Sequence, residues 1–290
     1  MDTQLAFEIL LPGLLACLLL TGFLSYLGLH VLARGVIFVD IALAQIAALG
    51  TAVADLNGVE PHTAASYVWS LAFTFGGAVL FALTRGVRKR VPQEAFIGIT
   101  YVVAAASAIL VAKYLPHGDE EIKEILIGSL LTVHLPEVGV TAAIFAALAV
   151  FHFFFRKRFL ELSFEHDHGE EGHPESEGLK PMLWDLLFYA TFGVVITSSV
   201  QMAGVLLVFS FLIVPAVFSA LFTKRIGLRL VMAWALGAVA SAAGLYGSFS
   251  LDLPTGAAVV VAFGIALLGG AALRFVLTMR ERKANPAASP

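Results

Sequence analysis

The chain has 290 residues, of which 59% are hydrophobic and 13% are charged, and its formal net charge is −3. Soluble domains have about 45–50% apolar and about 25% charged residues, so this composition excludes an ordinary soluble domain and indicates a membrane protein. The single cysteine, Cys17, excludes a disulfide framework and a multi-cysteine zinc site. No G-x-x-x-x-G-K-[ST] motif occurs, so we do not expect this chain to bind and hydrolyse ATP through a P-loop on its own.

Hydrophobic runs decide the fold class. A helix that crosses about 30 Å of hydrocarbon at about 1.5 Å per residue needs about 20 apolar residues. We therefore predict an all-α membrane protein with about nine transmembrane helices, the sixth and seventh separated by a tight turn near Gln201–Ala203. The nine runs are Phe7–Leu29, Val36–Leu56, Ala64–Thr84, Ala95–Leu115, Val138–Phe155, Met182–Gln201, Ala203–Phe222, Leu230–Phe249 and Gly256–Thr278.

The basic residues predict the orientation, because cytoplasmic loops accumulate Lys and Arg. With the N-terminus outside and the C-terminus inside, all but Lys113 and Lys123 of the 18 basic residues lie at the inner side. Arg34 and Arg274 belong to this inner group. The opposite orientation would reverse the distribution, so we predict that the N-terminus lies outside and the C-terminus inside.

The polar segments divide the chain further. We predict a transmembrane domain over residues 1–278, a cytoplasmic His-rich loop at 159–181, and a disordered cytoplasmic tail at 279–290. The longest outside segment, His117–Glu137, contains KEILIGSLLTVHL, which is too short to span and is expected to be re-entrant or interfacial.

Two polar residues interrupt the second run, Asp40 and Gln45. A carboxylate within hydrocarbon costs about 2.5–3.5 kcal/mol even on lenient scales, so it normally faces a protein interior or a water-filled path. Small residues surround them, and small side chains let membrane helices approach closely. We interpret this run as a pathway-lining helix, although the two side chains point roughly 140° apart. A buried polar pair satisfied by neighbouring helices is the alternative.

The inside loop FEHDHGEEGHPESEG offers imidazole and carboxylate ligands on a Gly-containing segment. Such tracts suit zinc and related divalent ions. The spacing matches no closed tetrahedral site, so any metal bound by this loop would be held weakly and exchangeably. The alternative is that the loop is a solvated acidic linker that binds no metal. The candidate metal ligands are His166, His168 and His173.

Three further polar or kinking residues lie in the predicted spans. Pro215 frees a backbone carbonyl one turn earlier, which either kinks the seventh helix for packing or lets polar groups line a cavity. Asp185 is expected at the membrane interface near Lys180, and His152 is expected to be structural.

Several segments together resemble one family. They are LGLHVLARGVIFVDIALAQIAALG, EAFIGITYVVAAA, ILIGSLLTV, QMAGVLLVFSFLIVPAVFSALFTKR and GLYGSFSLDLPTGAAVVV, in that order from about Leu10 to about Leu277. The chain resembles the membrane permease subunit of zinc/manganese-type metal-ion ABC importers. The resemblance implies a type II ABC importer-like bundle, a homodimer of permease subunits, two cytoplasmic ATPase subunits, an extracytoplasmic metal-binding protein and no nucleic-acid partner.

The family commonly carries the motif D-x-x-S-H in the second span, and this chain lacks that motif. Counted from Arg34 without a gap, its Asp, Ser and His positions fall on Ile41, Ala44 and Gln45. Zinc prefers nitrogen and sulfur donors. Because this chain has no imidazole at the motif's His position, the second span does not decide which metal is carried. The resemblance also implies an ATPase-contact motif in the inside loop, of which Gly178-Leu179 is the remnant.

The sequence thus predicts an ABC permease that imports a divalent metal, zinc or manganese, by alternating access, with no covalently bound cofactor. Two alternatives remain. An ABC permease for a metal chelate fits the weak ligand set of the second span. An ion-coupled secondary carrier would show more intramembrane carboxylates and internal repeats than this chain does.

Overall fold

The computed structural model describes residues 3–61, 63–84, 91–115, 118, 128, 130, 133–164 and 179–284. Within these residues the chain is helical, and nine of its helices are long and apolar enough to cross a membrane, as the hydrophobic runs predict. The helices are α1 (Thr3–Arg34), α2 (Val39–Leu56), α3 (Ala64–Leu83), α4 (Gln93–Ala112), α6 (Leu135–Phe154), α7 (Arg156–Phe164), α8 (Leu179–Ala203), α9 (Val205–Phe222), α10 (Ile226–Leu251) and α11 (Thr255–Ala284).

Two of the expected boundaries lie elsewhere. The structure continues α11 to Ala284, into the segment 279–290 for which we expect disorder. It also extends two helices into the predicted loop at 159–181, because α7 extends to Phe164 and α8 begins at Leu179. The turn between the sixth and seventh spans falls at Gly204, whose φ of 76° is a left-handed value that only glycine adopts without strain. The central part of the segment with KEILIGSLLTVHL lies outside the described residues.

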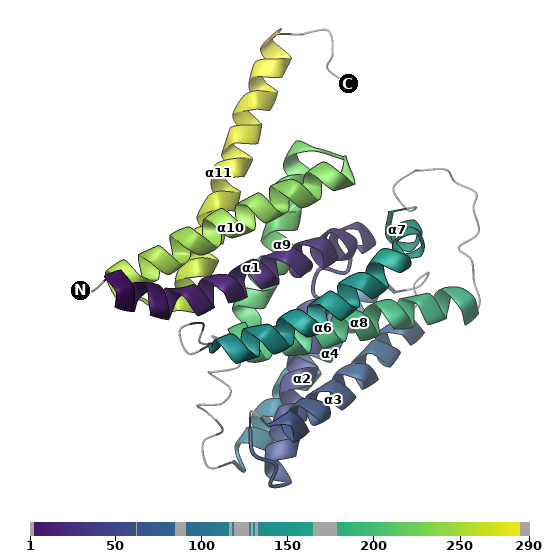
Figure 1. The fold of residues 1–290 in the computed structure, drawn as a ribbon. Coiled ribbons are helices and arrows are strands. Elements are labelled where there is room, and N and C mark those ends of the chain that lie inside the picture. Colours follow the sequence, from purple (N-terminus) through teal and green to yellow (C-terminus); the bar gives the residue numbers. More distant parts are fainter. Residues whose placement is uncertain are drawn as a thin grey trace.

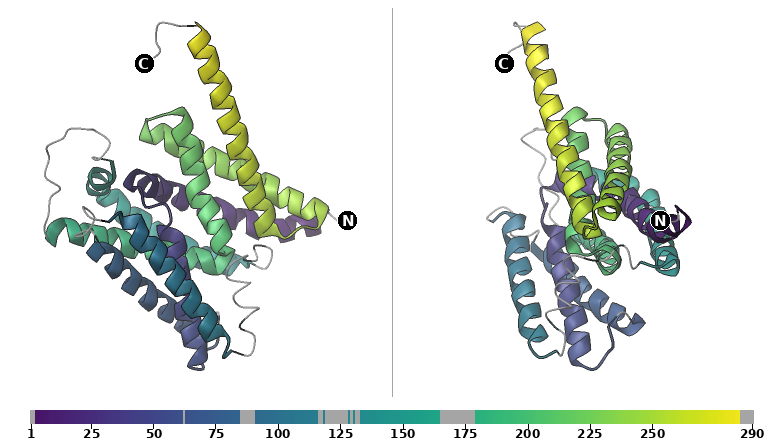
Figure 2. Two further views of the ribbon diagram at one scale, coloured as in Figure 1. Left: turned by 180° about the vertical axis from the view of Figure 1, so that it is seen from behind. Right: turned by 90° about the vertical axis from the view of Figure 1, so that its left-hand side faces the viewer.

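The helices form two groups (Figure 1). In one, α2 packs against α3, α4 and α8, and in the other α1 packs against α9 and α10, with α11 completing the group. Figure 2 shows the two groups from behind and from the side, with α11 extending beyond its neighbours. Helix α8 contacts both groups, because it packs against α2, α3, α1 and α9.

Burial identifies the central helices. In both α2 and α8, 67% of the residues in the most apolar stretch are buried, against 22% in α4, α6, α10 and α11. The predicted pathway helix is therefore an interior element, whereas the four exposed helices present their apolar side chains at the surface of the bundle, where lipid is the expected neighbour.

Small residues allow the central helices to approach one another. A Cβ at Gly28 would collide with the backbone carbonyl of Leu212, so α1 and α9 are in contact along their backbones there. A Cβ at Gly50 would lie 3.0 Å from the Cα of Ser70, so α2 and α3 are almost as close. Such contacts are typical of helix packing in membranes, where apolar burial gives helices little reason to associate.

The predicted orientation is testable with new cysteines. Asn57, after α2, and Lys224, after α9, are both exposed, and the basic-residue distribution assigns them to opposite sides of the membrane. Because Cys17 is buried, the unmodified chain should not react with an impermeant thiol reagent. In intact cells we expect labelling of Asn57→Cys but not of Lys224→Cys, with both labelled after permeabilisation. The reverse pattern would overturn the orientation.

Candidate transport pathway and the buried polar network

Helix α2 carries the two residues predicted to line a pathway. Asp40 lies in the first turn of α2, at the end that faces the cytoplasm in the predicted orientation, and it is 1% exposed. Neither of its carboxyl oxygens has a hydrogen-bond partner among the described residues. The first turn is the favourable end of a helix for negative charge, because its backbone N–H groups lack intrahelical partners. A buried carboxyl group without partners is costly, which favours a role beyond packing.

Gln45 lies in the same helix and is 7% exposed. The neighbouring family-motif positions, Ile41 and Ala44, carry apolar side chains. The structure thus places Asp40 and Gln45 in one central helix but in different turns. Among the described residues, no group of three or more His, Cys, Asp or Glu side chains is arranged to hold a metal ion.

Pro215 is buried in the interior of α9, which runs from Val205 to Phe222. Because proline has no N–H, it cannot bond the Phe211 carbonyl one turn earlier. Helix α9 also packs against α2, so this carbonyl belongs to a helix that borders the predicted pathway helix.

The outer half of the bundle holds a seam of hydroxyl groups between α2, α3 and α8. The Ser70 hydroxyl donates to the Ala47 carbonyl at 2.7 Å and lies 2.7 Å from the Thr51 hydroxyl. Thr74 and Thr197 join α3 to α8 at 3.0 Å. These side chains are paired, so the seam holds the central helices together.

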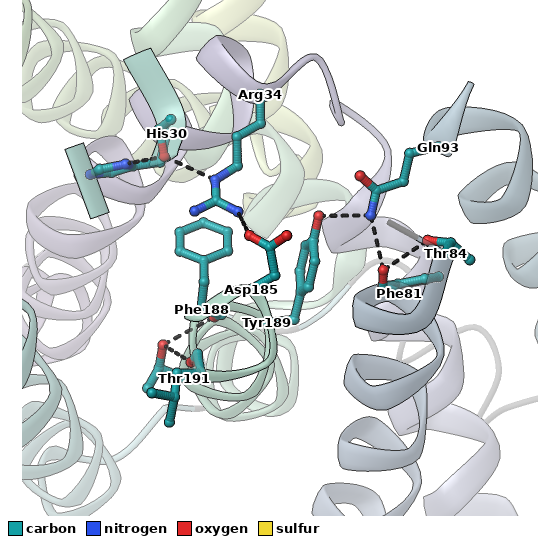
Figure 3. Close-up of polar contacts among 11 residues, drawn as sticks. His30, Arg34, Phe81, Thr84, Gln93, Asp185, Phe188, Tyr189 and Thr191 are labelled. Carbon is teal, nitrogen blue, oxygen red and sulfur yellow. Dashed lines mark hydrogen bonds and ion pairs between the residues drawn. The ribbon is translucent and has the colours of Figure 1, made fainter. Parts of the chain in front are cut away.

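A charged network occupies the inner end of the bundle, and sequence reasoning missed it (Figure 3). The Arg34 guanidinium forms an ion pair with the Asp185 carboxylate at 2.9 Å, with side chains only 5% and 7% exposed. Its Nε donates to the Ser163 hydroxyl, which also bonds His30 Nδ1, each at 2.9 Å. The guanidinium carbon lies 3.9 Å from the centre of the Phe188 ring.

This network corrects two predictions. Arg34 does not simply face the cytoplasm, and Asp185 does not sit at the interface beside Lys180, because the two side chains bury each other. The network joins the end of α1 to α7 and α8, the two helices that flank the His-rich loop. The signal available in the sequence was the pair of opposite charges, one at each of two span ends.

Two further buried polar residues at this end, Gln93 and His152, also have partners. Gln93 Nε2 donates to the Phe81 carbonyl at 3.1 Å and to the Tyr189 hydroxyl at 3.0 Å, which ties α3, α4 and α8 together (Figure 3). His152 lies 3.0 Å from the Thr191 hydroxyl, as its expected structural role requires.

The loop candidates cannot be placed. His166, His168, His173 and Gly178 lie outside the described residues, and Leu179 is the first residue of α8.

A bundle of candidate spans built around a helix with a buried, unpaired carboxyl group is the architecture of a membrane transport protein. Residues 6–274 match the ABC 3 transport family, so the chain belongs to that family, as the resemblance implied. It is therefore a permease-type membrane component of an ABC transporter, and the ion-coupled secondary carrier is set aside.

Three proteins of similar sequence, all of them membrane components of metal transport systems by name, agree with membership of this family. The chain is 28% identical over 236 residues to the manganese transport system membrane protein MntC of Listeria monocytogenes, covering 79% of this chain and 81% of the relative. It is 27% identical over 211 residues to the chelated iron transport system membrane protein YfeC of Yersinia pestis, covering 70% and 69%. It is 24% identical over 269 residues to the manganese import system permease protein ScaB of Streptococcus parasanguinis, covering 89% and 90%.

Two solved structures share the fold. One is PsaBC from Streptococcus pneumoniae in complex with Fab, with a TM-score of 0.71 at 20% identity, covering 91% of each chain. The other is described as "An inward-facing conformation of a putative metal-chelate type ABC transporter", with a TM-score of 0.66 at 19% identity, covering 97% of this chain and 90% of that one. At these identities the likeness concerns the fold, and it confirms the predicted helical permease architecture.

Proposed function

We propose that this chain is the permease subunit of an ABC importer for a divalent metal ion, with manganese or zinc as the leading cargo. The names of the relatives support a metal cargo, because they include manganese and iron transport proteins. The observation in this chain that carries the proposal is the buried Asp40 carboxyl group, which has no partner among the described residues. Carboxylate oxygen suits Mn²⁺ better than it suits Zn²⁺, which favours manganese.

The proposed route follows α2. Asp40 would meet the ion at the inner end of the helix, and Gln45 would offer an amide oxygen further out. Pro215 would contribute through the carbonyl that it leaves free in α9. Alternating access then requires the two helix groups to move relative to each other around α2 and α8.

The proposed assembly is a homodimer of this chain with two cytoplasmic ATPase subunits and an extracytoplasmic metal-binding protein, in a prokaryotic inner (plasma) membrane. ATP would be hydrolysed on the partner subunits, and this chain would carry out no covalent chemistry. We propose Gly178 and Leu179 as part of the ATPase contact, since α8 begins there at the side rich in basic residues.

Metal uptake by reconstituted complexes tests the proposal. Vesicles that hold the permease, its ATPase partner and its binding protein should accumulate Mn²⁺ or Zn²⁺ only when ATP is supplied on the ATPase side. An ATPase variant that cannot hydrolyse ATP is the matched control. ATP-dependent uptake of neither ion would count against a divalent metal cargo.

A chelated metal is the second candidate. Gln45 stands where the family carries imidazole, and a weaker ligand set suits a cargo that brings its own ligands. The fold match to a metal-chelate type transporter agrees with this reading. Uptake from metal–chelator complexes, with the chelator labelled, separates the two: labelled chelator inside the vesicles identifies a chelate permease.

We also propose that His166, His168 and His173 gather a divalent ion at the cytoplasmic side. Ordering such a loop costs about 1–2 kcal/mol per fixed residue, so the affinity should be modest. Binding should weaken below about pH 6.5, where imidazole protonates. In the assembled complex, replacement of the three histidines by Ala should remove the zinc binding that the loop adds, as measured by calorimetry. If transport is then unchanged, the loop only buffers zinc and has no part in transport. If the unmodified complex binds no additional zinc at mildly alkaline pH, the loop is a solvated linker without a metal site.

A further inference from the structure

The junction of α6 and α7 forms an aromatic and basic corner at the surface of the bundle. Helix α6 ends at Phe154 and α7 begins at Arg156. A hollow of about 290 Å³ lies at the junction, lined by Phe153, Phe154, Phe155, Arg156, Lys157 and Arg158. We refer to these six residues as the α6–α7 corner.

The exposure of the corner is unusual for aromatic residues. Phe153 is 61% exposed and Phe154 is 76% exposed. In a helix that is buried over only 22% of its apolar stretch, such rings need an apolar neighbour, and the acyl chains of the bilayer supply one. The rings therefore place this end of α6 at the hydrocarbon boundary.

Positive charge follows immediately. Arg156, Lys157 and Arg158 are all exposed, and they lie on the side that the basic-residue distribution assigns to the cytoplasm. Arg158 is partly neutralised by Glu161 at 3.2 Å. The Arg156 guanidinium lies 4.7 Å from the centre of the Phe153 ring, one of the rings that line the hollow. Within the part of the chain that the structure describes, no carboxylate forms an ion pair with Arg156 or Lys157.

We propose that the α6–α7 corner binds an anionic phospholipid of the cytoplasmic leaflet, such as phosphatidylglycerol. The phosphate would lie between Arg156 and Lys157, and the acyl chains would run along the exposed rings of Phe153 and Phe154. Charge complementarity favours this occupant, because basic pockets beside transmembrane helices at the cytoplasmic side suit anionic headgroups. The site is separate from α2 and does not depend on the identity of the cargo.

A natural reporter lies beside the corner. The Trp184 ring is 5.4 Å from the Phe155 ring and 5.9 Å from the Phe159 ring, measured between centroids. Bromine atoms on acyl chains quench tryptophan fluorescence only at short range. With Trp69 and Trp234 replaced by Phe, quenching of Trp184 therefore reports the lipid that occupies the corner.

The experiment uses the full chain in nanodiscs that contain brominated phosphatidylglycerol or brominated phosphatidylcholine at equal mole fraction. We expect the anionic lipid to bind in preference, by roughly five-fold for each available cation. Arg156→Gln with Lys157→Gln should bring the ratio close to one. The matched control, Arg280→Gln with Lys283→Gln, removes two exposed cations from the end of α11 and should leave the ratio unchanged.

The proposal can fail in three ways. A ratio near one in the otherwise unmodified reporter chain, or a ratio that the paired substitution leaves unchanged, would overturn it. If the preference for the anionic lipid disappears when the ATPase subunits are added, then the α6–α7 corner is a docking site for those subunits and not a lipid site. A salt series needs no substitution at the corner: added salt should lower the ratio, since exposed charges are screened over about 10 Å at 0.1 M.

Discussion

Replacing Asp185 with Asn should lower the unfolding temperature of the chain by on the order of 10 °C. The Arg34 guanidinium and the Asp185 carboxylate lie 2.9 Å apart and are almost completely buried. Removing one partner of a buried ion pair costs about 3–5 kcal/mol, because the remaining charge loses its compensation. About 1 kcal/mol corresponds to a few degrees in a chain of this size.

Cys17 provides the measurement. It is the single cysteine and is fully buried, so a thiol-reactive dye should report the temperature at which the bundle opens. Glu281→Gln is the matched control, since its pair with Arg274 is 3.5 Å long and exposed, and such pairs contribute about 0–1 kcal/mol. Replacing both partners, as Arg34→Met with Asp185→Leu, should recover part of the loss. If Asp185→Asn and Glu281→Gln unfold at the same temperature, the buried ion pair does not stabilise the bundle.

The helices were predictable because their signal is local. Each span is an uninterrupted apolar run, and the cost of unpaired backbone groups in hydrocarbon leaves helix as the form that such a run takes. The break between the sixth and seventh spans was predicted near Gln201–Ala203 from the limits of the two apolar runs, and the structure places it one residue further on, at Gly204. The distribution of Lys and Arg similarly predicts the sidedness without any knowledge of contacts.

The buried network was not predictable because its signal is distant. Arg34 and Asp185 are 151 positions apart, and Arg34 and Ser163 are 129 apart. Span hydropathy does not say which helix ends meet, and a cation at a span end is normally solvated. Arg34 was therefore counted with the cytoplasmic charges, although the structure buries it between α1, α7 and α8.

Asp40 shows both the reach and the limit of the sequence. Its burial in the central helix followed from the cost of a carboxylate in an apolar run. Its place in the first turn of α2 is a structural finding, as is the absence of a hydrogen-bond partner among the described residues. Neither could be read from the order of residues, because partner groups come from other helices.

Asp40→Asn should reduce metal transport at least about tenfold while leaving the chain as stable as before or slightly more stable. Loss of about 1.4 kcal/mol of attraction between cation and carboxylate is sufficient for a tenfold effect on rate. The amide has nearly the same shape and carries no charge, so burying it in the same position costs less than burying a carboxylate. If Asp40 served only packing, the substitution would lower the stability of the chain and leave transport unchanged.

Uptake in vesicles and the reactivity of Cys17 on heating separate the two quantities in the same preparations. Asp55→Asn is the matched control, because Asp55 lies at the other end of α2 and the same change there should affect neither quantity. Asp40→Glu keeps the charge and should retain more transport than Asp40→Asn. If transport survives both Asp40→Asn and Gln45→Leu with its metal dependence unchanged, then α2 is not the route, and the ion must cross the bundle along other helices.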